Sequence, residues 1–193
     1  MDSPLLDIPC VILCGGKSSR MGEDKSLLPF SSYSTLTSYQ YNKLKKIFKN
    51  VYLSSKINKF DFISEDRLIL DEAKTYSPIA ALQSIFSKLD SNKVFIITVD
   101  TPLVKFESIR KLVDESNGYD ISVAKTSRVH NLCGVFNKNK VLPIVEQMLK
   151  DDFHKVGFLL KHLFTNYVNF PKEDEFININ KKEDYQKAIS III

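Results

Sequence analysis

The stretch from Leu13 to Lys25 combines the residue types that bind phosphate groups. It reads L-C-G-G-K-S-S-R-M-G-E-D-K and follows directly from a short apolar run. Gly15 and Gly16 carry no Cβ, so the backbone can turn at positive φ and bring its N–H groups close to an anion or a flat base. Arg20 offers a planar fork of donors, and Lys25 offers a compact positive charge. We name this stretch the phosphate loop and expect it to bind a nucleotide.

The spacing of the glycines disfavours two familiar nucleotide motifs. Gly15, Gly16 and Gly22 fit neither the G-x-G-x-x-G of dinucleotide oxidoreductases nor the G-x-x-x-x-G-K-[ST] of P-loop NTPases. A lone pair of glycines is more often an ordinary turn with solvated charges. The complete stretch, with its two cations and its small hydroxyl residues, favours phosphate binding over that structural alternative.

A carboxylate follows the strongest apolar run of the chain, K-V-F-I-I-T-V at 93–99. Asp100 is followed by Thr101 and Pro102, so we expect it where a buried strand meets solvent. Mg²⁺ prefers hard oxygen ligands and often takes only one or two protein carboxylates beside phosphate oxygens and water. The structural alternative is an Asp-Thr-Pro turn in which the aspartate bonds to backbone. Together with the phosphate loop, this position favours Asp100 as a metal ligand.

Short β-rich apolar runs alternate with segments of helical period, which predicts an α/β fold with a parallel sheet. The expected strands lie at 10–14, 51–54, 67–70 and 93–99, and apolar stripes over 39–48 and 79–89 predict crossover helices. The second half is less regular, with apolar segments at 119–125, 132–136 and 176–180 and helices at about 138–150, 155–164 and 181–193. In such folds ligands bind beyond the carboxyl ends of the strands. The phosphate loop and Asp100 both follow predicted strands.

Size and composition set broad limits on the protein. With 193 residues, of which 44% are hydrophobic, the chain can bury a core as one domain over 1–193. The net charge of +4 is mild and spread along the chain, which gives little support to nucleic-acid binding. Cys10, Cys14 and Cys133 form no CxxC pair, which favours buried thiols in a reducing compartment. An acidic N-terminus and the lack of a long apolar run lead us to expect a cytoplasmic protein without a membrane span.

The phosphate loop resembles the L-A-G-G-x-S-x-R-M-G-x-D-K signature of the MobA-like nucleotidyltransferases, the superfamily that includes the molybdenum cofactor guanylyltransferases. V-D-T-P at 99–102 resembles the C-D-x-P element of the same family. The resemblance implies a three-layer Rossmann-like sandwich of the nucleotide-diphospho-sugar transferase type, with a mostly parallel central sheet. It also implies that Asp100 binds Mg²⁺ and contacts the nucleotide. The other residues that would hold the nucleotide are Leu13, Cys14, Gly15, Gly16, Arg20 and Lys25.

A third element bears on the choice of base. Asp71, followed by S-P-I-A-A at 77–81, resembles an aspartate followed by G-P-L-x-G in the family, which implies that Asp71 contacts the nucleotide. Ser77 and Ala81 replace the two glycines of that pattern. Ser54 stands where many relatives carry an asparagine that contacts the nucleotide, so we include it among the nucleotide-binding candidates. These departures leave the base open.

Two later elements resemble the branch of the family that acts on the molybdenum cofactor. V-H-N-L-C-G-V at 129–135 resembles H-P-x-x-G/A-x-(F/L), and F-I-N-I-N at 176–180 resembles the start of F-x-N-x-N-T-P-E-D. The resemblance makes His130, Asn178 and Asn180 candidate acceptor-binding residues. The structural alternatives are a satisfied core histidine for His130, a backbone bridge for Asn178 and a helix cap for Asn180.

The resemblance implies that the chain transfers GMP from GTP to the phosphate of molybdopterin or its molybdenum-loaded form, with Mg²⁺ as cofactor. A phosphate attacker is already deprotonated near neutral pH, so no general base is needed. Arg20, Lys25 and the metal at Asp100 would then oppose the developing negative charge. The nucleotide-binding half would span about 8–105 and the acceptor-binding half about 106–193.

Two other functions remain open from the sequence. One is a related enzyme that uses CTP or another NTP on a molybdopterin or sugar-phosphate acceptor. The other is a nucleotide-binding regulator without catalysis, although Asp100 argues against it.

Protein partners would be those that supply molybdopterin or mature molybdoenzymes, with no role for nucleic acid or a membrane.

Overall fold

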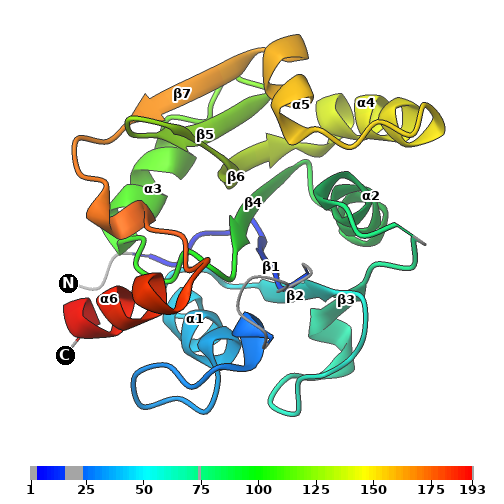
Figure 1. Cartoon of the computed structure of the whole chain (residues 1–193). Coiled ribbons are helices and arrows are strands. Elements are labelled where there is room, and N and C mark those ends of the chain that lie inside the picture. The colour runs from blue at the N-terminus through cyan, green and yellow to red at the C-terminus, as the bar shows by residue number, and fades with distance from the viewer. Residues whose placement is uncertain (1–3, 16–23, 74, 193) are drawn as a thin grey trace.

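A seven-stranded sheet forms the centre of the molecule, shown in Figure 1. The computed structural model describes residues 4–15, 24–73 and 75–192. The strand order across the sheet is β3-β2-β1-β4-β6-β5-β7. The strands are β1 (Cys10–Leu13), β2 (Val51–Ser55), β3 (Leu68–Leu70), β4 (Lys93–Thr98), β5 (Ile121–Lys125), β6 (Val129–Asn137) and β7 (Thr165–Asn169).

Most neighbouring strands of this sheet run in the same direction. β1 pairs in parallel with both β2 and β4, and β2 pairs in parallel with β3. β6 runs antiparallel to β4 and to β5, while β7 is again parallel to β5. β6 is therefore the strand that runs against the others in the described sheet, and the expected mostly parallel sheet is confirmed.

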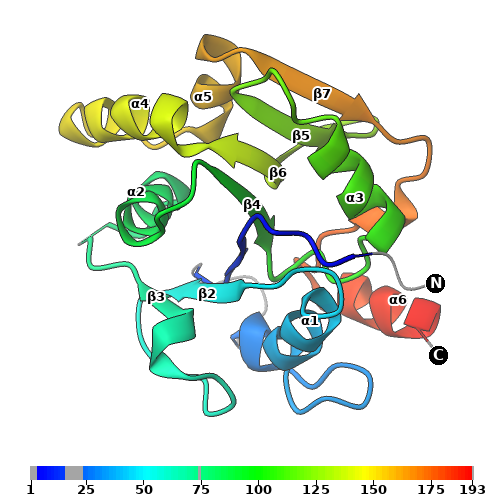
Figure 2. The same ribbon diagram turned by 180° about the vertical axis from the view of Figure 1, so that it is seen from behind.

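Helices cover both faces of the sheet and make three layers, as Figures 1 and 2 show from opposite sides. Apolar side chains of α1 (Leu36–Leu44), α3 (Phe106–Asp114) and α6 (Lys182–Ile192) share one buried cluster. Those of α2 (Pro78–Lys88), α4 (Lys138–Lys150) and α5 (Val156–His162) share the other. Side chains along β1 alternate between the two clusters, since successive residues of a strand face opposite sides. The expected three-layer α/β sandwich is confirmed.

Most of the elements expected from the sequence occur close to their predicted bounds. The four strands of the first half are β1 to β4, and the helix expected at 138–150 is α4. The helices expected at 155–164 and 181–193 are α5 and α6, each within two residues of the prediction. The stripe over 39–48 is only partly helical, because α1 ends at Leu44, the buried Ile47 lies in the turn that follows, and the buried Phe48 forms an isolated bridge with Leu6.

Two elements were not predicted. α3 was missed although Ile109 and Leu112 lie on its buried face at helical spacing. β7 was missed because T-N-Y-V-N is short and polar and forms the last strand of the sheet. The segment 176–180 begins with the last residue of a short 3₁₀ turn, η3 (Asp174–Phe176), and is not a strand.

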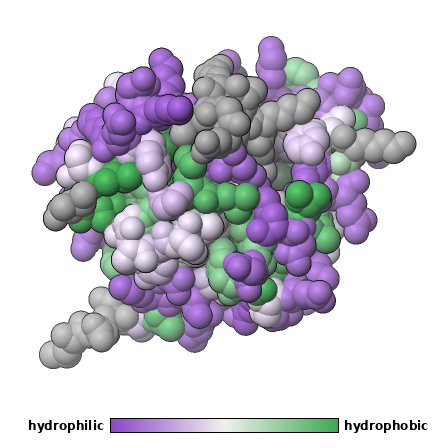
Figure 3. Space-filling view, turned by 60° about the horizontal axis from the view of Figure 1, so that its bottom comes forward, coloured by the Kyte–Doolittle hydropathy of each residue, from purple (hydrophilic) through white to green (hydrophobic). Residues whose placement is uncertain are grey.

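The surface shown in Figure 3 is covered mostly by hydrophilic side chains, with apolar side chains in separate areas between them. Scattered exposure of this kind is ordinary on proteins and carries no functional argument. Within residues 4–15, 24–73 and 75–192, no helix has the length and apolar character needed to cross a bilayer.

Candidate functional site

The carboxyl ends of β1 to β4 lie side by side and open onto two pockets. The larger pocket has a volume of about 590 Å³ and the smaller pocket about 320 Å³. Thr98 and Leu132 line both of them, so the two pockets adjoin at the tip of β4. The larger pocket is lined by Leu13, Gly15, Ser54, Ser55, Lys56, Asp71, Thr75, Tyr76, Ser77, Pro78, Ala81, Thr98 and Leu132. The smaller pocket is lined by Thr98, Asp100, Thr101, Arg128, Val129, His130, Asn131, Leu132, Cys133 and Asn178.

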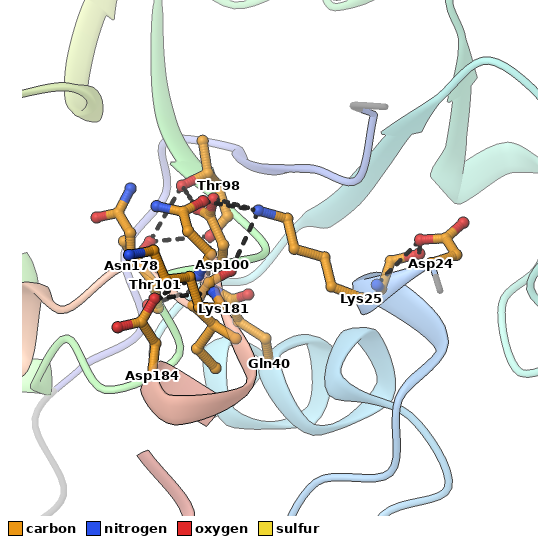
Figure 4. A network of polar contacts seen from close by, with 12 residues as sticks. Asp24, Lys25, Gln40, Thr98, Asp100, Thr101, Asn178, Lys181 and Asp184 are labelled. Carbon is orange, nitrogen blue, oxygen red and sulfur yellow. Dashed lines mark hydrogen bonds and ion pairs between the residues drawn. The ribbon is translucent and has the colours of Figure 1, made fainter. Parts of the chain in front are cut away.

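Asp100 occupies the turn that ends β4, and both of its carboxylate oxygens are engaged (Figure 4). The Thr98 hydroxyl donates to Oδ1 at 2.5 Å, and the Lys25 ammonium donates to Oδ2 at 2.7 Å. The side chains of Lys25 and Asp100 are 19% and 14% exposed, so water screens this ion pair only in part. The end of the phosphate loop therefore meets the carboxylate that was predicted to bind metal.

Lys25 begins a short 3₁₀ turn, η1 (Lys25–Leu27), which Asp24 caps. The Asp24 carboxylate accepts hydrogen bonds from the Ser26 N–H at 3.0 Å and the Ser26 hydroxyl at 2.6 Å, and it pairs with Lys59. Partial burial would raise the pKa of Asp24, but the bonds from Lys59 and Ser26 outweigh it and the pKa is lowered. The turn is also tied to α1, because the Thr37 hydroxyl donates to the Ser26 carbonyl at 2.7 Å. These contacts fix the base from which Lys25 reaches Asp100.

The segment before α6 crosses the same site. The Ile179 N–H donates to the Asp100 carbonyl at 2.8 Å, and Lys25 donates to the Ile179 carbonyl and to Asn180 Oδ1, each at 3.3 Å. At the start of α6, the Asp184 carboxylate accepts from the backbone N–H groups of Asn180 and Lys181. The Asn180 side chain itself is in contact with Lys25.

Two side chains of α1 hold the turn that carries Asp100. Gln40 Nε2 donates to the carbonyls of Thr98 and Thr101 at 3.2 and 3.4 Å. Lys43 Nζ donates to the carbonyls of Pro102 and Val104, both at 2.7 Å. Burial lowers the pKa of Lys43 to about 8, although Glu175 and Glu107 oppose the shift. The position of Asp100 is thus set by a helix distant from it in sequence.

At the far side of the larger pocket, Lys56 and Asp71 form a buried ion pair. Lys56 follows β2 directly and Asp71 follows β3, and Lys56 Nζ lies 2.8 Å from Asp71 Oδ2. The exposed fractions of the two side chains are 13% and 5%. The other carboxylate oxygen, Oδ1, accepts from the Ala73 N–H at 3.1 Å and from the Ser84 hydroxyl at 3.4 Å. Asp71 is therefore held on two sides while it still lines the pocket.

His130 and Asn178 line the smaller pocket beside Asp100. The Thr126 hydroxyl lies 2.9 Å from His130 Nε2, and Asn178 Oδ1 accepts from Arg128 at 3.3 Å. Burial lowers the pKa of His130, the nearby Arg128 adds to the effect, and Glu173 opposes it. We therefore expect a neutral imidazole at neutral pH. The pocket thus combines one carboxylate, one guanidinium and neutral polar groups.

The three cysteines are free and buried. Burial raises the pKa of Cys14 and of Cys133 to about 12, and it raises the pKa of Cys10 well above the ordinary thiol value. A thiol reacts through its thiolate, so these groups are unsuited to nucleophilic catalysis. The expectation of buried thiols is confirmed.

Most of the residues singled out from the sequence gather at this edge of the sheet. Leu13, Gly15, Ser54 and Asp71 line the larger pocket, and Asp100, His130 and Asn178 line the smaller one. Cys14 packs in the cluster on the α1 side of the sheet, whereas Leu13 packs on the α2 side. Gly16 and Arg20 lie outside the described residues.

Lys56, Thr98 and Arg128 are among the residues of the site that were missed. Lys56 directly follows a predicted strand, so the same search along strand ends could have found it. Thr98 is the last residue of β4, and Arg128 lies two residues before His130. Neither of the latter two carries a signal of its own in the sequence.

Comparison with known proteins identifies the family of the chain. The model of the MobA-like NTP transferase domain matches residues 10–166. A molybdenum cofactor guanylyltransferase of Campylobacter jejuni subsp. doylei is 43% identical over 188 residues, which cover 95% of this chain and 96% of the relative. Another from Helicobacter pylori is 36% identical, with 100% of this chain and 97% of the relative covered.

A solved structure shares the fold at lower identity. The molybdopterin-guanine dinucleotide biosynthesis protein A of Archaeoglobus fulgidus has a TM-score of 0.81 at 20% identity, covering 96% of this chain and 98% of the other. Domain match, sequence identity over nearly the full length and shared fold lead to one conclusion: the chain belongs to the MobA-like NTP transferase family, in the group of the molybdenum cofactor guanylyltransferases.

Proposed function

We propose that the chain transfers GMP from GTP to the terminal phosphate of molybdopterin and releases pyrophosphate. The observation that carries this proposal is the contact of 2.7 Å between Lys25 and Asp100, whose carboxylate also accepts from Thr98, a residue that lines both pockets. It brings a phosphate-binding cation and a potential metal ligand to one point, as a triphosphate requires. The names of the full-length relatives supply the identity of the base and of the acceptor.

The larger pocket has the size and lining expected for the nucleoside. Its volume of about 590 Å³ falls in the range of roughly 300–1,000 Å³ that is typical of small-molecule sites. Leu13 and Gly15 would lie along the base, while the buried Cys14 would contribute its backbone. The phosphates would then run towards Lys25 and Asp100. The sequence resemblance would place Gly16 along the base with Leu13 and Gly15, and Arg20 at the triphosphate.

The donor set at Asp100 fits Mg²⁺. No group of three or more His, Cys, Asp or Glu side chains is placed to hold a metal in the described part of the chain. One carboxylate is nevertheless enough for Mg²⁺, because the ion fills its shell with phosphate oxygens and water. When bound at Asp100, Mg²⁺ would neutralise charge on the triphosphate.

The smaller pocket would take the acceptor. It adjoins the larger pocket at Thr98 and contains His130 and Asn178, and both belong to the proposed acceptor half at about 106–193. An acceptor phosphate oxygen would form a bond to the α-phosphorus of GTP as the bond from that phosphorus to the β-phosphate bridge oxygen breaks. The leaving group is pyrophosphate, and Lys25 opposes the negative charge of the reacting phosphates. A neutral His130 would bind the acceptor without exchanging a proton.

The proposed setting is the cytoplasm, because three free buried thiols fit a reducing compartment. Proteins that supply molybdopterin or receive the dinucleotide cofactor would be the partners.

The test is a product analysis with purified protein, molybdopterin and Mg²⁺. Parallel reactions with GTP, CTP and ATP are followed by mass spectrometry of the cofactor and by pyrophosphate release. We expect molybdopterin guanine dinucleotide from GTP and little product from the other two. Cytosine dinucleotide as the main product would instead favour the CTP-using relative, and nucleotide binding without pyrophosphate release would favour a regulator.

A further inference from the structure

Lys56 and Asp71 place a hydrogen-bond donor directly beside an acceptor on the wall of the larger pocket. The donor atom, Lys56 Nζ, lies 2.8 Å from the acceptor atom, Asp71 Oδ2, and both residues line the pocket. Lys56 also donates to the Ala73 carbonyl and lies 5.4 Å from the centre of the Tyr76 ring. Ala73 thus bonds to both members of the pair, since its N–H donates to Asp71. The donor and the acceptor are therefore held in a fixed order.

We propose that this pair reads a base edge on which a carbonyl oxygen stands next to a ring N–H, with Lys56 donating to the oxygen and Asp71 accepting from the N–H. The proposal rests on the proposed function, because it assigns the larger pocket to the base of the NTP. Guanine has this edge at O6 and N1–H, and hypoxanthine has the same one. An ionised carboxylate has about four lone-pair sites, so Asp71 can accept from the base while it keeps its present partners.

The fixed order of the pair also rejects adenine and cytosine, whereas uracil, with a carbonyl oxygen beside its N3–H, shares the edge that the pair reads. Adenine presents an amino group where guanine has O6, and an unprotonated ring nitrogen where guanine has N1–H. Lys56 would then face a donor and Asp71 would face an acceptor. Cytosine likewise places an unprotonated ring nitrogen beside its carbonyl oxygen or its amino group. A buried site that is built for hydrogen bonds discriminates strongly against a ligand that leaves them unmade.

The experiment measures the affinity of the intact protein for four triphosphates by calorimetry: GTP, ITP, ATP and the triphosphate of 2-aminopurine riboside. ITP keeps the O6 and N1–H edge and lacks the 2-amino group. 2-Aminopurine keeps the 2-amino group and lacks O6 and N1–H. We expect ITP to bind within about tenfold of GTP, and ATP and the 2-aminopurine nucleotide to bind about 10- to 100-fold more weakly, the range for one lost hydrogen bond to a charged group. The reverse order of ITP and the 2-aminopurine nucleotide would overturn the proposal.

Variants of Lys56 then test whether this residue recognises the base. In Lys56→Met, we expect GTP affinity to fall about 10- to 100-fold while affinity for the 2-aminopurine nucleotide changes little. Lys56→Gln keeps an N–H donor for Asp71 and serves as the second variant, because removing Lys56 leaves a buried carboxylate without its cation. The matched control is Lys49→Met, since Lys49 precedes β2 at its opposite end and pairs with the exposed Asp7.

Two outcomes separate this inference from the proposed function. An equal loss of affinity for all four nucleotides in both Lys56 variants would mean that Lys56 contacts phosphate, and would overturn base reading alone. Base discrimination that depends on Lys56, without transfer to molybdopterin, would leave the inference standing and refute the proposed function.

Discussion

Lys25→Met removes the charge that joins three segments of the site and keeps a side chain of similar length. The lost contacts include the ion pair to Asp100 at 2.7 Å and the two bonds at 3.3 Å to Ile179 and Asn180. The phosphate loop, the end of β4 and the segment before α6 would then be held together without this cation. The substitution therefore tests both catalysis and the stability of the site.

The two effects have different expected sizes. Hydrogen bonds to charged groups contribute about 1.5–3 kcal/mol, and partial exposure of Lys25 and Asp100 places the stability loss near the lower end of that range. For a chain of this size, a loss of about 2 kcal/mol lowers Tm by roughly 4–8 °C. The loss of one preorganised charge on the reacting phosphates lowers turnover by about 10²–10³-fold.

Pyrophosphate release at saturating GTP and Mg²⁺, measured well below Tm, separates catalysis from stability. The control is Lys49→Met, which removes an exposed surface ion pair and should leave both quantities nearly unchanged. Turnover of Lys25→Met within about threefold of the wild type would refute the role of Lys25 at the reacting phosphates, whatever its Tm.

Two further predictions concern the frame of the site. Gly134→Ala should lower the free energy of unfolding by about 3 kcal/mol, because an added Cβ would lie 2.0 Å from the Ser122 carbonyl oxygen. Calorimetry should show a fall in Tm for this variant but not for the control Gly157→Ala, whose added Cβ would meet open space. An unchanged Tm for Gly134→Ala would contradict the close pairing of β5 with β6. For His130, burial and then Arg128 lower the pKa below its ordinary value of 6.5, so just below that pH the unfolded chain binds the proton while the folded chain does not. The free energy of unfolding should therefore rise with pH through that interval. Denaturant unfolding between about pH 5 and about pH 8 should show a weaker rise in His130→Gln than in the wild type. Parallel plots of the free energy of unfolding against pH for the two proteins would refute the lowered pKa of His130.

The sequence was enough to predict the sheet and the edge at which the site lies. Apolar runs located β1 to β4, and the rule that ligands bind beyond strand ends led to the phosphate loop and Asp100, while the family resemblance added Leu13 and Asp71. These side chains do gather there because parallel strands bring their carboxyl ends to one edge. The predicted nearness of the phosphate loop and Asp100 is confirmed by the contact that Lys25 makes with Asp100.

The parts that were missed depend on contacts between distant segments. The partners of Lys56 and the support that Gln40 gives to the Asp100 turn arise only when β2, β3 and α1 are packed together. The contact of Asn180 Oδ1 with Lys25 could not be predicted either, because it joins segments at opposite ends of the chain. The periodicity of apolar residues predicts helices and strands, but it does not predict which groups the long polar side chains contact.

The most direct test of the account is the Mg²⁺ dependence of pyrophosphate release in Asp100→Ala, compared with the wild type in the presence of GTP and molybdopterin. A single magnesium-bound triphosphate that runs from the larger pocket to Asp100 predicts saturable Mg²⁺ dependence in the wild type and no measurable release from the variant at any Mg²⁺ concentration. Release from Asp100→Ala at the wild-type rate, with the same Mg²⁺ dependence, would contradict it.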